Sequence, residues 1–184
     1  MYEYNEHIDK DTKNSNNPSK IDKKFLDDLS KFIQSVESEM DIMLPGSASL
    51  QFLWYYKIID YIISQKLAKN IIIRLLCPLD ENSARLTKQL VPFVGYRSIN
   101  LSLPNTPSNS LFFIRDNQDI FSFSIEIQRQ QQQQQQQQYD NNKDSYTIFS
   151  VNNWSYSDDI PIVRNAVYCF DMIWEEKEKI MIKS

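Results

Sequence analysis

The side chains that most often carry catalysis are scarce in this chain. His7 is the only histidine among 184 residues, and it lies in a polar N-terminal stretch. A serine or cysteine nucleophile needs a base such as histidine beside it, and a histidine-based metal site needs the same residue type. Only two glycines occur, Gly46 and Gly95, whereas dinucleotide fingerprints and phosphate loops need several glycines at fixed offsets. We therefore expect no catalytic residue, no metal and no cofactor.

The spacing of the adjacent acidic residues and of the two cysteines indicates structural rather than catalytic roles. Adjacent residues on a helix point about 100° apart, so adjacent carboxylates do not converge as an acid–base couple. The pairs are Asp27–Asp28, Asp158–Asp159 and Glu175–Glu176. Cys77 and Cys169 are far apart, and neither has a cysteine or histidine at metal-ligand spacing. We expect both to be buried free thiols.

Short polar side chains follow three of the expected strands, where a ligand would meet free backbone amides and hydroxyls. The candidate ligand-binding residues are Gly46, Ser47 and Ser49 after the first strand, Asp80 and Asn82 after the second, and Asn152, Asn153 and Trp154 after the last. Two amides beside an aromatic ring suit a polyol or a planar ligand. The same residue types also serve as helix caps and turns, so that alternative stays open.

Arg74 is a charged residue inside an apolar strand, Ile71–Cys77. A buried guanidinium needs a partner, and we expect a structural bridge to Asp116 or Glu126 rather than a ligand.

Composition and charge favour a cytoplasmic protein without nucleic-acid or membrane partners. The 20 basic residues are scattered among 24 acidic ones, the net charge is −4, and the pI is about 5.1. A nucleic-acid or anionic-membrane surface would instead concentrate lysine and arginine. The longest apolar stretch, residues 50–63, is too short to cross a bilayer, and the acidic N-terminus is unlike a secretion signal. The expected partner is a small molecule or a signalling protein, with a homodimer as a further option.

The apolar periodicity predicts alternating helices and strands through the first half of the chain. Apolar residues recur at helical spacing over residues 22–38 and 48–67. Continuous apolar runs at 40–44 and 71–77 read as buried strands. Asp80 is placed to cap a helix that runs to about Leu90.

In the second half of the chain the period changes to two. Alternation predicts strands around 99–103, 111–114 and 121–127, the last two joined by a hairpin at 116–119, with a final strand at 146–151. Apolar residues at steps of three and four from Ile160 to Trp174 predict a closing helix. This order implies an α/β fold with a mixed, largely parallel sheet and helices on both faces.

The domain organisation follows from where apolar residues are lacking. Residues 1–20 are polar and are expected to be a disordered arm. Residues 21–180 are expected to form a single domain, interrupted at about 128–145 by a surface loop that contains the uninterrupted run Gln130–Gln138.

Several stretches, taken in order, resemble one half of a phospholipase D-like fold. They are Met40–Pro45, Asn70–Pro78, Leu111–Asp116, and the block from Phe149 to Trp174. Active members of that superfamily carry a histidine, a lysine two residues later and an aspartate five further on. Here Asn109 and Leu111 stand at the first two positions, and only Asp116 remains. The resemblance therefore implies a fold without its phosphodiesterase chemistry, and we read Asp116 as the opening residue of a hairpin turn.

Degenerate domains of this kind are found in archaeal signal-transduction histidine kinases and in sugar-responsive transcription regulators. The resemblance therefore implies a non-catalytic sensor domain in signal transduction, such as the input part of a two-component histidine kinase system, whose kinase activity would reside in modules outside this chain. Two alternatives stay open. One is a divergent phosphodiesterase or hydrolase using Asp80, Asp116 or Ser47, and the other is the effector domain of a transcription regulator.

Overall fold

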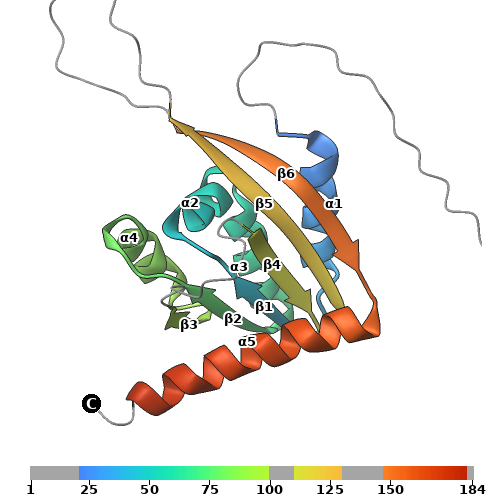
Figure 1. Cartoon of the computed structure of the whole chain (residues 1–184), viewed down its shortest axis with the longest axis vertical. Helices are drawn as coiled ribbons and strands as arrows, with labels where there is room; N and C mark the ends of the chain where they lie inside the picture. The colour runs from blue at the N-terminus through green and yellow to red at the C-terminus, as the bar shows by residue number, and fades with distance from the viewer. Residues whose placement is uncertain (1–20, 100–109, 130–146, 182–184) are drawn as a thin grey trace, which may run out of the picture.

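The computed structural model describes residues 21–99, 110–129 and 147–181 (Figure 1). The expected arm at 1–20 lies outside the described residues. So does most of the expected glutamine-rich loop, although the strand before that loop extends to Arg129. In chain order the elements are α1 (Lys23–Gln34), β1 (Glu39–Met43), α2 (Ser47–Tyr55), α3 (Ile58–Lys69), β2 (Ile72–Cys77), α4 (Glu81–Leu90), β3 (Gly95–Ser98), β4 (Ser110–Arg115), β5 (Asp119–Arg129), β6 (Thr147–Ser157) and α5 (Ile160–Met181).

The six strands form one mixed sheet in the order β3-β2-β1-β4-β5-β6. β1, β2 and β3 are parallel, because helices cross over between them. β4, β5 and β6 continue the sheet antiparallel from the other side of β1. The α/β class and the mixed sheet are confirmed, but the parallel part is smaller than the sequence suggested, because tight turns join β4 to β5.

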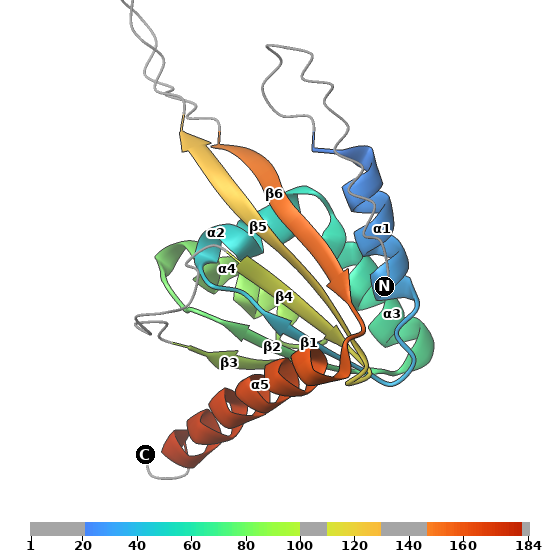
Figure 2. The same cartoon turned by 45° about the vertical axis from the view of Figure 1, so that its right-hand side comes forward.

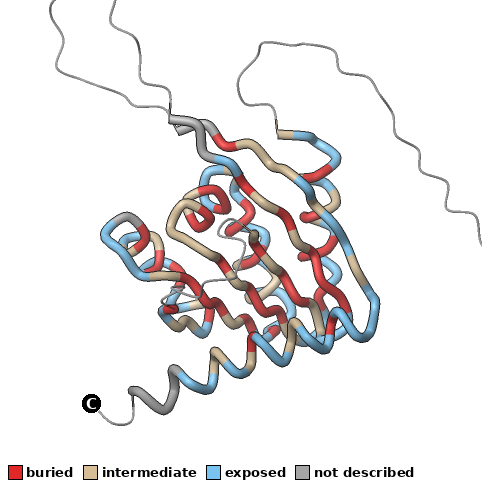
Figure 3. The backbone as a smooth tube through the Cα atoms, in the orientation of Figure 1, coloured by how far each residue is buried: buried red, intermediate tan, exposed pale blue. Residues whose placement is uncertain are grey.

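The helices divide unequally between the two faces of the sheet (Figures 1 and 2). α1 to α4 cover one face and bury the larger cluster of apolar side chains with it. α5 lies alone across the other face and buries a smaller cluster that includes Val163 and Phe170. The red interior strands and the pale outer side of α5 in Figure 3 show the same division. α5 is therefore the one described helix that can move without opening the main core.

The main core is held by aromatic contacts between α1 and the antiparallel strands. Phe25 lies edge-on to Phe123, with ring centroids 4.8 Å apart, and Phe121 stacks on Trp154 at 5.8 Å. Such pairs contribute about 0.5–1.5 kcal/mol each beyond the apolar area they bury. Asp22 is the N-cap of α1, and its side chain accepts from the Lys24 amide at 2.8 Å.

The single helix predicted at 48–67 is divided into α2 and α3. Lys57 separates them in the left-handed region, with φ 57°. No glycine or proline marks this break. Its physical reason is burial, because Leu53 and Ile59 are both buried but would point about 120° apart on one continuous helix. The break lets both side chains reach the core.

Two predicted strands and the predicted burial of the two cysteines can also be compared with the structure. Most of the strand predicted at 99–103 lies outside the described residues, and a strand that was not predicted, β3, ends just before it at Ser98. The strand predicted to stop at Val151 continues to Ser157 as β6. Cys77 is buried as expected, but Cys169 is exposed on α5, which corrects the prediction of two buried thiols. Within the described residues, no helix is at once long enough and apolar enough to cross a membrane.

Candidate functional site

Two of the three candidate groups lie at the same edge of the sheet. β1 and β2 are parallel neighbours, so Gly46, Ser47 and Ser49 after β1 and Asp80 after β2 share the carboxyl end of the strands. Gly46 is the N-cap of α2, and its carbonyl accepts from the amide of Ser49, which is 2% exposed. The first group therefore builds the start of a helix.

Asp80 also builds a helix start. Its carboxylate accepts from the Ser83 amide at 2.8 Å, while the Ser83 hydroxyl accepts from the Asp80 amide at 2.9 Å. This reciprocal arrangement is a capping box, which satisfies two otherwise unpaired amides. Asn82 lies in the first turn of α4, and its side chain is outside the described part of the chain. The capping alternative accounts for Asp80, and ligand contact at this edge stays a prediction.

The third group does not join the other two, which corrects its expected place. Asn152, Asn153 and Trp154 lie within β6 rather than after it. The pairing of β5 with β6 shifts between Ser122 and Ser124, so that β6 has one extra residue here. Asn153 takes the left-handed conformation, with φ 50°, that such a bulge requires and that asparagine tolerates. Trp154 packs toward α1 and Phe121. The three residues therefore lie within β6, and ligand contact by their side chains stays a prediction.

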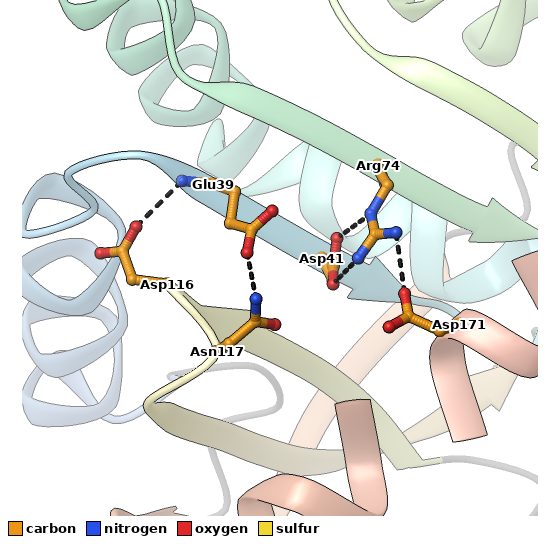
Figure 4. A network of polar contacts seen from close by, with 6 residues as sticks. All are labelled: Glu39, Asp41, Arg74, Asp116, Asn117 and Asp171. Atoms are coloured by element: carbon orange, nitrogen blue, oxygen red, sulfur yellow. Dashed lines mark hydrogen bonds and ion pairs between the residues drawn. The ribbon is translucent and has the colours of Figure 1, made fainter. Parts of the chain in front are cut away.

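A charged cluster that the sequence did not reveal lies between the sheet and α5 (Figure 4). Arg74 of β2 holds Asp41 of β1 with two parallel hydrogen bonds of 2.6 Å and reaches Asp171 of α5 at 2.8 Å. The Asp41 side chain is 2% exposed, and those of Arg74 and Asp171 are 21% and 42% exposed. The partners expected for Arg74, Asp116 and Glu126, are therefore wrong. A charged residue within an apolar strand indicated that Arg74 needs a partner. Which residue is the partner is determined by the parallel pairing of β1 with β2, which places Asp41 opposite Arg74.

The electrostatics of this cluster follow from its partial burial. Burial raises the pKa of Asp41, against the lowering effect of Arg74. Burial also raises the pKa of Glu39, two residues earlier on the same strand, and the negative charge of Asp41 adds to that shift. Burial alone would lower the pKa of Arg74, but its bonds to Asp41 and Asp171 raise it. Arg74 is therefore the fixed positive charge that holds two carboxylates from different elements.

Aromatic rings of α5 complete the contact with the parallel strands. Phe170 and Trp174 stack at 5.8 Å, and the Arg74 guanidinium lies 5.0 Å from the Phe170 ring. Arg97 of β3 lies 4.2 Å from the Trp174 ring and also donates to the Trp174 carbonyl. Such cation–π contacts contribute about 0.5–2 kcal/mol, depending on exposure.

Gly95 gives Trp174 its place on the sheet. A methyl group added at Gly95 would lie 3.3 Å from the indole Cη2 atom, which is closer than an ordinary carbon–carbon contact. The sequence shows Gly95 only as an isolated glycine, and nothing in the chain order links it to a residue 79 positions later.

Asp116 binds backbone rather than a ligand. It opens the turn between β4 and β5, as expected, with φ 50°. Its carboxylate accepts from the amides of Glu37, Ser38 and Glu39 at 3.0, 2.7 and 2.9 Å, and from the Ser38 hydroxyl at 2.7 Å. Burial opposes ionisation, but these hydrogen bonds outweigh it and lower the pKa of Asp116. This clasp fixes the segment that joins α1 to β1, beside the contact between Asn117 and Glu39 in Figure 4.

Within the described ranges, no group of three or more histidine, cysteine, aspartate or glutamate side chains is arranged to hold a metal ion. The charged cluster attaches α5 to the sheet through the ion pair of Arg74 with Asp171.

Comparison with known proteins gives a distant structural likeness and no family. No family model matches the chain, and no curated protein matches it, so the phospholipase D-like resemblance stays a prediction. Among solved structures, the chain is similar to TrmBL2, described as an archaeal chromatin protein that shows a novel mode of DNA binding. The TM-score is 0.46 at 13% identity, over 81% of this chain and 48% of that one. The chain thus spans about half the length of TrmBL2.

This comparison corrects one expectation from composition. The prediction that the chain has no nucleic-acid partner is wrong as an exclusion, because a structural neighbour is a DNA-binding chromatin protein. The likeness concerns the arrangement of the elements and does not extend DNA binding to this chain.

Proposed function

We propose that this chain is a non-catalytic binding module in signal transduction, and that α5 is the element that reports the bound state. One observation carries the proposal. α5 covers its face of the sheet alone and is attached there through Arg74, which at the same time holds the buried Asp41 of β1. A small displacement of β1 against β2 would change both ion pairs of Arg74, and α5 would respond.

The strength of the attachment suits a reporting element. Asp171 is 42% exposed, and ion pairs of that exposure contribute about 0–1 kcal/mol. Among the described residues, six are buried in the smaller cluster at α5 and 26 in the cluster on the other face of the sheet. Two positions of α5 would therefore differ by few contacts, as a two-state element requires.

A more specific form of this proposal is that the chain is the input part of a histidine kinase system. Its support is the order of the phospholipase D-like stretches in the sequence, and the kinase modules would lie outside this chain.

A hydrolase is the competing proposal, and the contacts of its candidate acids disfavour it. The Asp80 carboxylate caps α4, and the Asp116 carboxylate accepts from three backbone amides. A nucleophile whose lone pairs are occupied in this way is weakened. The test is a panel of phosphodiester and ester substrates offered to the wild type and to Asp116→Asn. Turnover that the substitution abolishes would establish the hydrolase and overturn our proposal.

The attachment of α5 can be tested with the two glycines of the chain. Gly95→Ala puts a methyl group against Trp174, whereas the same change at Gly46 meets no atom within 4 Å. We expect faster hydrogen exchange along residues 160–176 in Gly95→Ala, unchanged exchange in α1, and no such effect in Gly46→Ala. Equal exchange of α5 in both variants would contradict its role as a separately mobile element.

A further inference from the structure

A cavity of about 230 Å³ lies on the other face of the molecule, between α1 and the start of α3. The residues that line it include the apolar Leu26, Ile33 and Ile58 and two tyrosines, Tyr56 and Tyr61. At about 30 Å³ per water molecule, the volume equals about eight waters. It is therefore smaller than a typical drug-sized pocket and suits a small metabolite.

The charges at this cavity come in a matched pair. Lys23 and Asp27 both line it from α1, and residues four apart on a helix lie on the same side, about 6 Å along the axis. Ser30 continues the polar side one turn further, and its hydroxyl accepts from Gln34 at 3.2 Å. An ammonium and a carboxylate thus stand side by side in a cavity that apolar side chains also line.

The polar groups around the cavity lack partners within the protein. Among residues 21–99, 110–129 and 147–181, no hydrogen bond or ion pair engages the side-chain polar atoms of Lys23, Asp27, Tyr56 or Tyr61. By contrast, Arg74, Asp41 and Asp116 all have several. Four unpaired polar side chains around one cavity are a set of contacts available to a ligand.

The lining of the cavity also contains backbone strain. Tyr56 and Ile58, two of its lining residues, flank Lys57, which has φ 57°. A lysine in this region costs about 1–2 kcal/mol relative to the right-handed conformation. The break between α2 and α3 at this residue places the Tyr56 ring on the cavity rather than along a continuing helix.

We propose that this cavity binds a small zwitterion with an apolar side chain, that is, a free α-amino acid of the leucine or phenylalanine type. The ligand carboxylate pairs with Lys23, its ammonium pairs with Asp27, and its side chain lies on Leu26, Ile33 and Ile58 between the two tyrosine rings. A neutral sugar would leave both charges unpaired, and an apolar acid or amine would leave one.

The site supplies a ligand class for the proposed function, and in that respect it rests on it. α1 and α5 are both attached to β1 through named contacts. Lys69 of α3 donates to the carbonyls of Gln34 and Val36 at the end of α1, both at 2.8 Å, and Asp116 then clasps the entry to β1. Two residues into that strand, Asp41 holds Arg74, which holds α5. A ligand that tightens α1 against α3 therefore acts on β1, whose Asp41 holds the Arg74 side chain of β2 to which α5 is attached.

The binding test uses calorimetry on the full chain with L-leucine and L-phenylalanine. Two analogues of leucine serve as probes: 4-methylpentanoate, which lacks the amine, and 3-methylbutylamine, which lacks the carboxylate. Because each lost charge-assisted hydrogen bond costs about tenfold in affinity, we expect both analogues to bind about tenfold more weakly than leucine. Absence of binding by either amino acid, or equal binding of leucine and its two analogues, would overturn the proposal.

Matched variants separate the cavity from the rest of α1. Asp27→Asn and Lys23→Met should weaken leucine binding about tenfold, whereas Asp28→Asn and Lys31→Met, which do not line the cavity, should leave it unchanged. Ser30→Phe should fill the cavity and abolish binding, and thermal unfolding checks that this variant is folded. If the matched controls lose binding as much as the cavity variants, the site lies elsewhere.

Hydrogen exchange on α5 distinguishes failure of the site from failure of the proposed function. Leucine binding that depends on Asp27 but leaves α5 exchange unchanged would support the site and count against the reporting role of α5. Absence of leucine binding, together with the expected response of α5 to Gly95→Ala, would overturn the site alone.

Discussion

Arg74 of β2 and Asp171 of α5 are joined across the face of the sheet by an ion pair of 2.8 Å, and the same guanidinium holds Asp41 from the neighbouring strand. One side chain thus belongs at once to the interior of the sheet and to the outer helix. The two sides of this contact differ in burial, since Asp41 is 2% exposed and Asp171 is 42% exposed. That difference determines what each partner contributes to stability.

We predict that Arg74→Met lowers the free energy of unfolding by about 3 kcal/mol, because it leaves Asp41 buried without a partner. Asp171→Asn should cost less than about 1 kcal/mol, since its carboxylate is largely exposed. The double variant Asp41→Asn/Arg74→Met should recover part of the loss. Urea unfolding at pH 7 measures all three, and equal losses for Arg74→Met and Asp171→Asn would show that Asp41 is not the critical partner.

Asp116 makes stability depend on pH in acid. Its pKa lies below the ordinary value of 3.8 in the folded protein, so its stabilisation is present above that value and is lost as the pH falls through the lower folded pKa. Asp116→Asn should cost about 1–2 kcal/mol at pH 7, a value discounted for partial exposure. The difference from wild type should shrink as the pH falls below about 4.

Asp41 provides the control for that experiment, because its pKa is raised rather than lowered. Its contribution is most favourable below the ordinary value and declines as the pH rises through the folded pKa. Asp41→Asn should therefore show the opposite trend with pH. If both variants followed the same trend, the hydrogen bonds to Asp116 would not be the cause of its pH dependence.

Lys57→Gly should stabilise the protein by about 0.5–1 kcal/mol, because glycine relieves the left-handed strain at a modest entropic cost. Asn70→Gly is the matched control. Asn70 also has a left-handed φ, of 55°, but asparagine tolerates it, so we expect a change within a few tenths of a kcal/mol. Thermal unfolding measures both, and an equal gain at the two positions would refute strain at Lys57.

Asn153→Val should destabilise the fold by about 1–2 kcal/mol, because a β-branched residue is strained at φ 50°. Asn152→Val, one position earlier and at a regular place in the pairing of β6 with β5, should stay within about 0.5 kcal/mol. Should the two variants lose equal stability, the bulge would not be what selects asparagine.

Local signals predicted the elements that local chemistry decides. Asp80 was expected as an N-cap, and it forms the capping box of α4. The residues from Ile160 to Trp174 were expected to form the closing helix, and Val163 and Phe170 of α5 are buried against the sheet. In each case the deciding contacts lie within a few positions of one another, so the sequence carries them directly.

Tertiary contacts decided the features that the sequence did not predict. The partner of Arg74 follows from the register that places it opposite Asp41, and no local pattern specifies that register. The group Asn152–Trp154 looked like the end of a strand, but pairing with β5 carries β6 across the bulge. The α2–α3 break arises because two buried residues must face the same core. All three depend on residues that are far apart or on burial of a whole face.

The placement of Trp174 gives the molecule an optical signal of its own. The indole contacts the Arg97 guanidinium and the Phe170 ring and lies close to Gly95, so its emission depends on how α5 packs on the sheet. The sequence has three tryptophans, so replacing Trp54 and Trp154 by phenylalanine would leave Trp174 as its single tryptophan. Its intensity and quenching would then record every departure of α5 from the sheet in real time, with no dye attached.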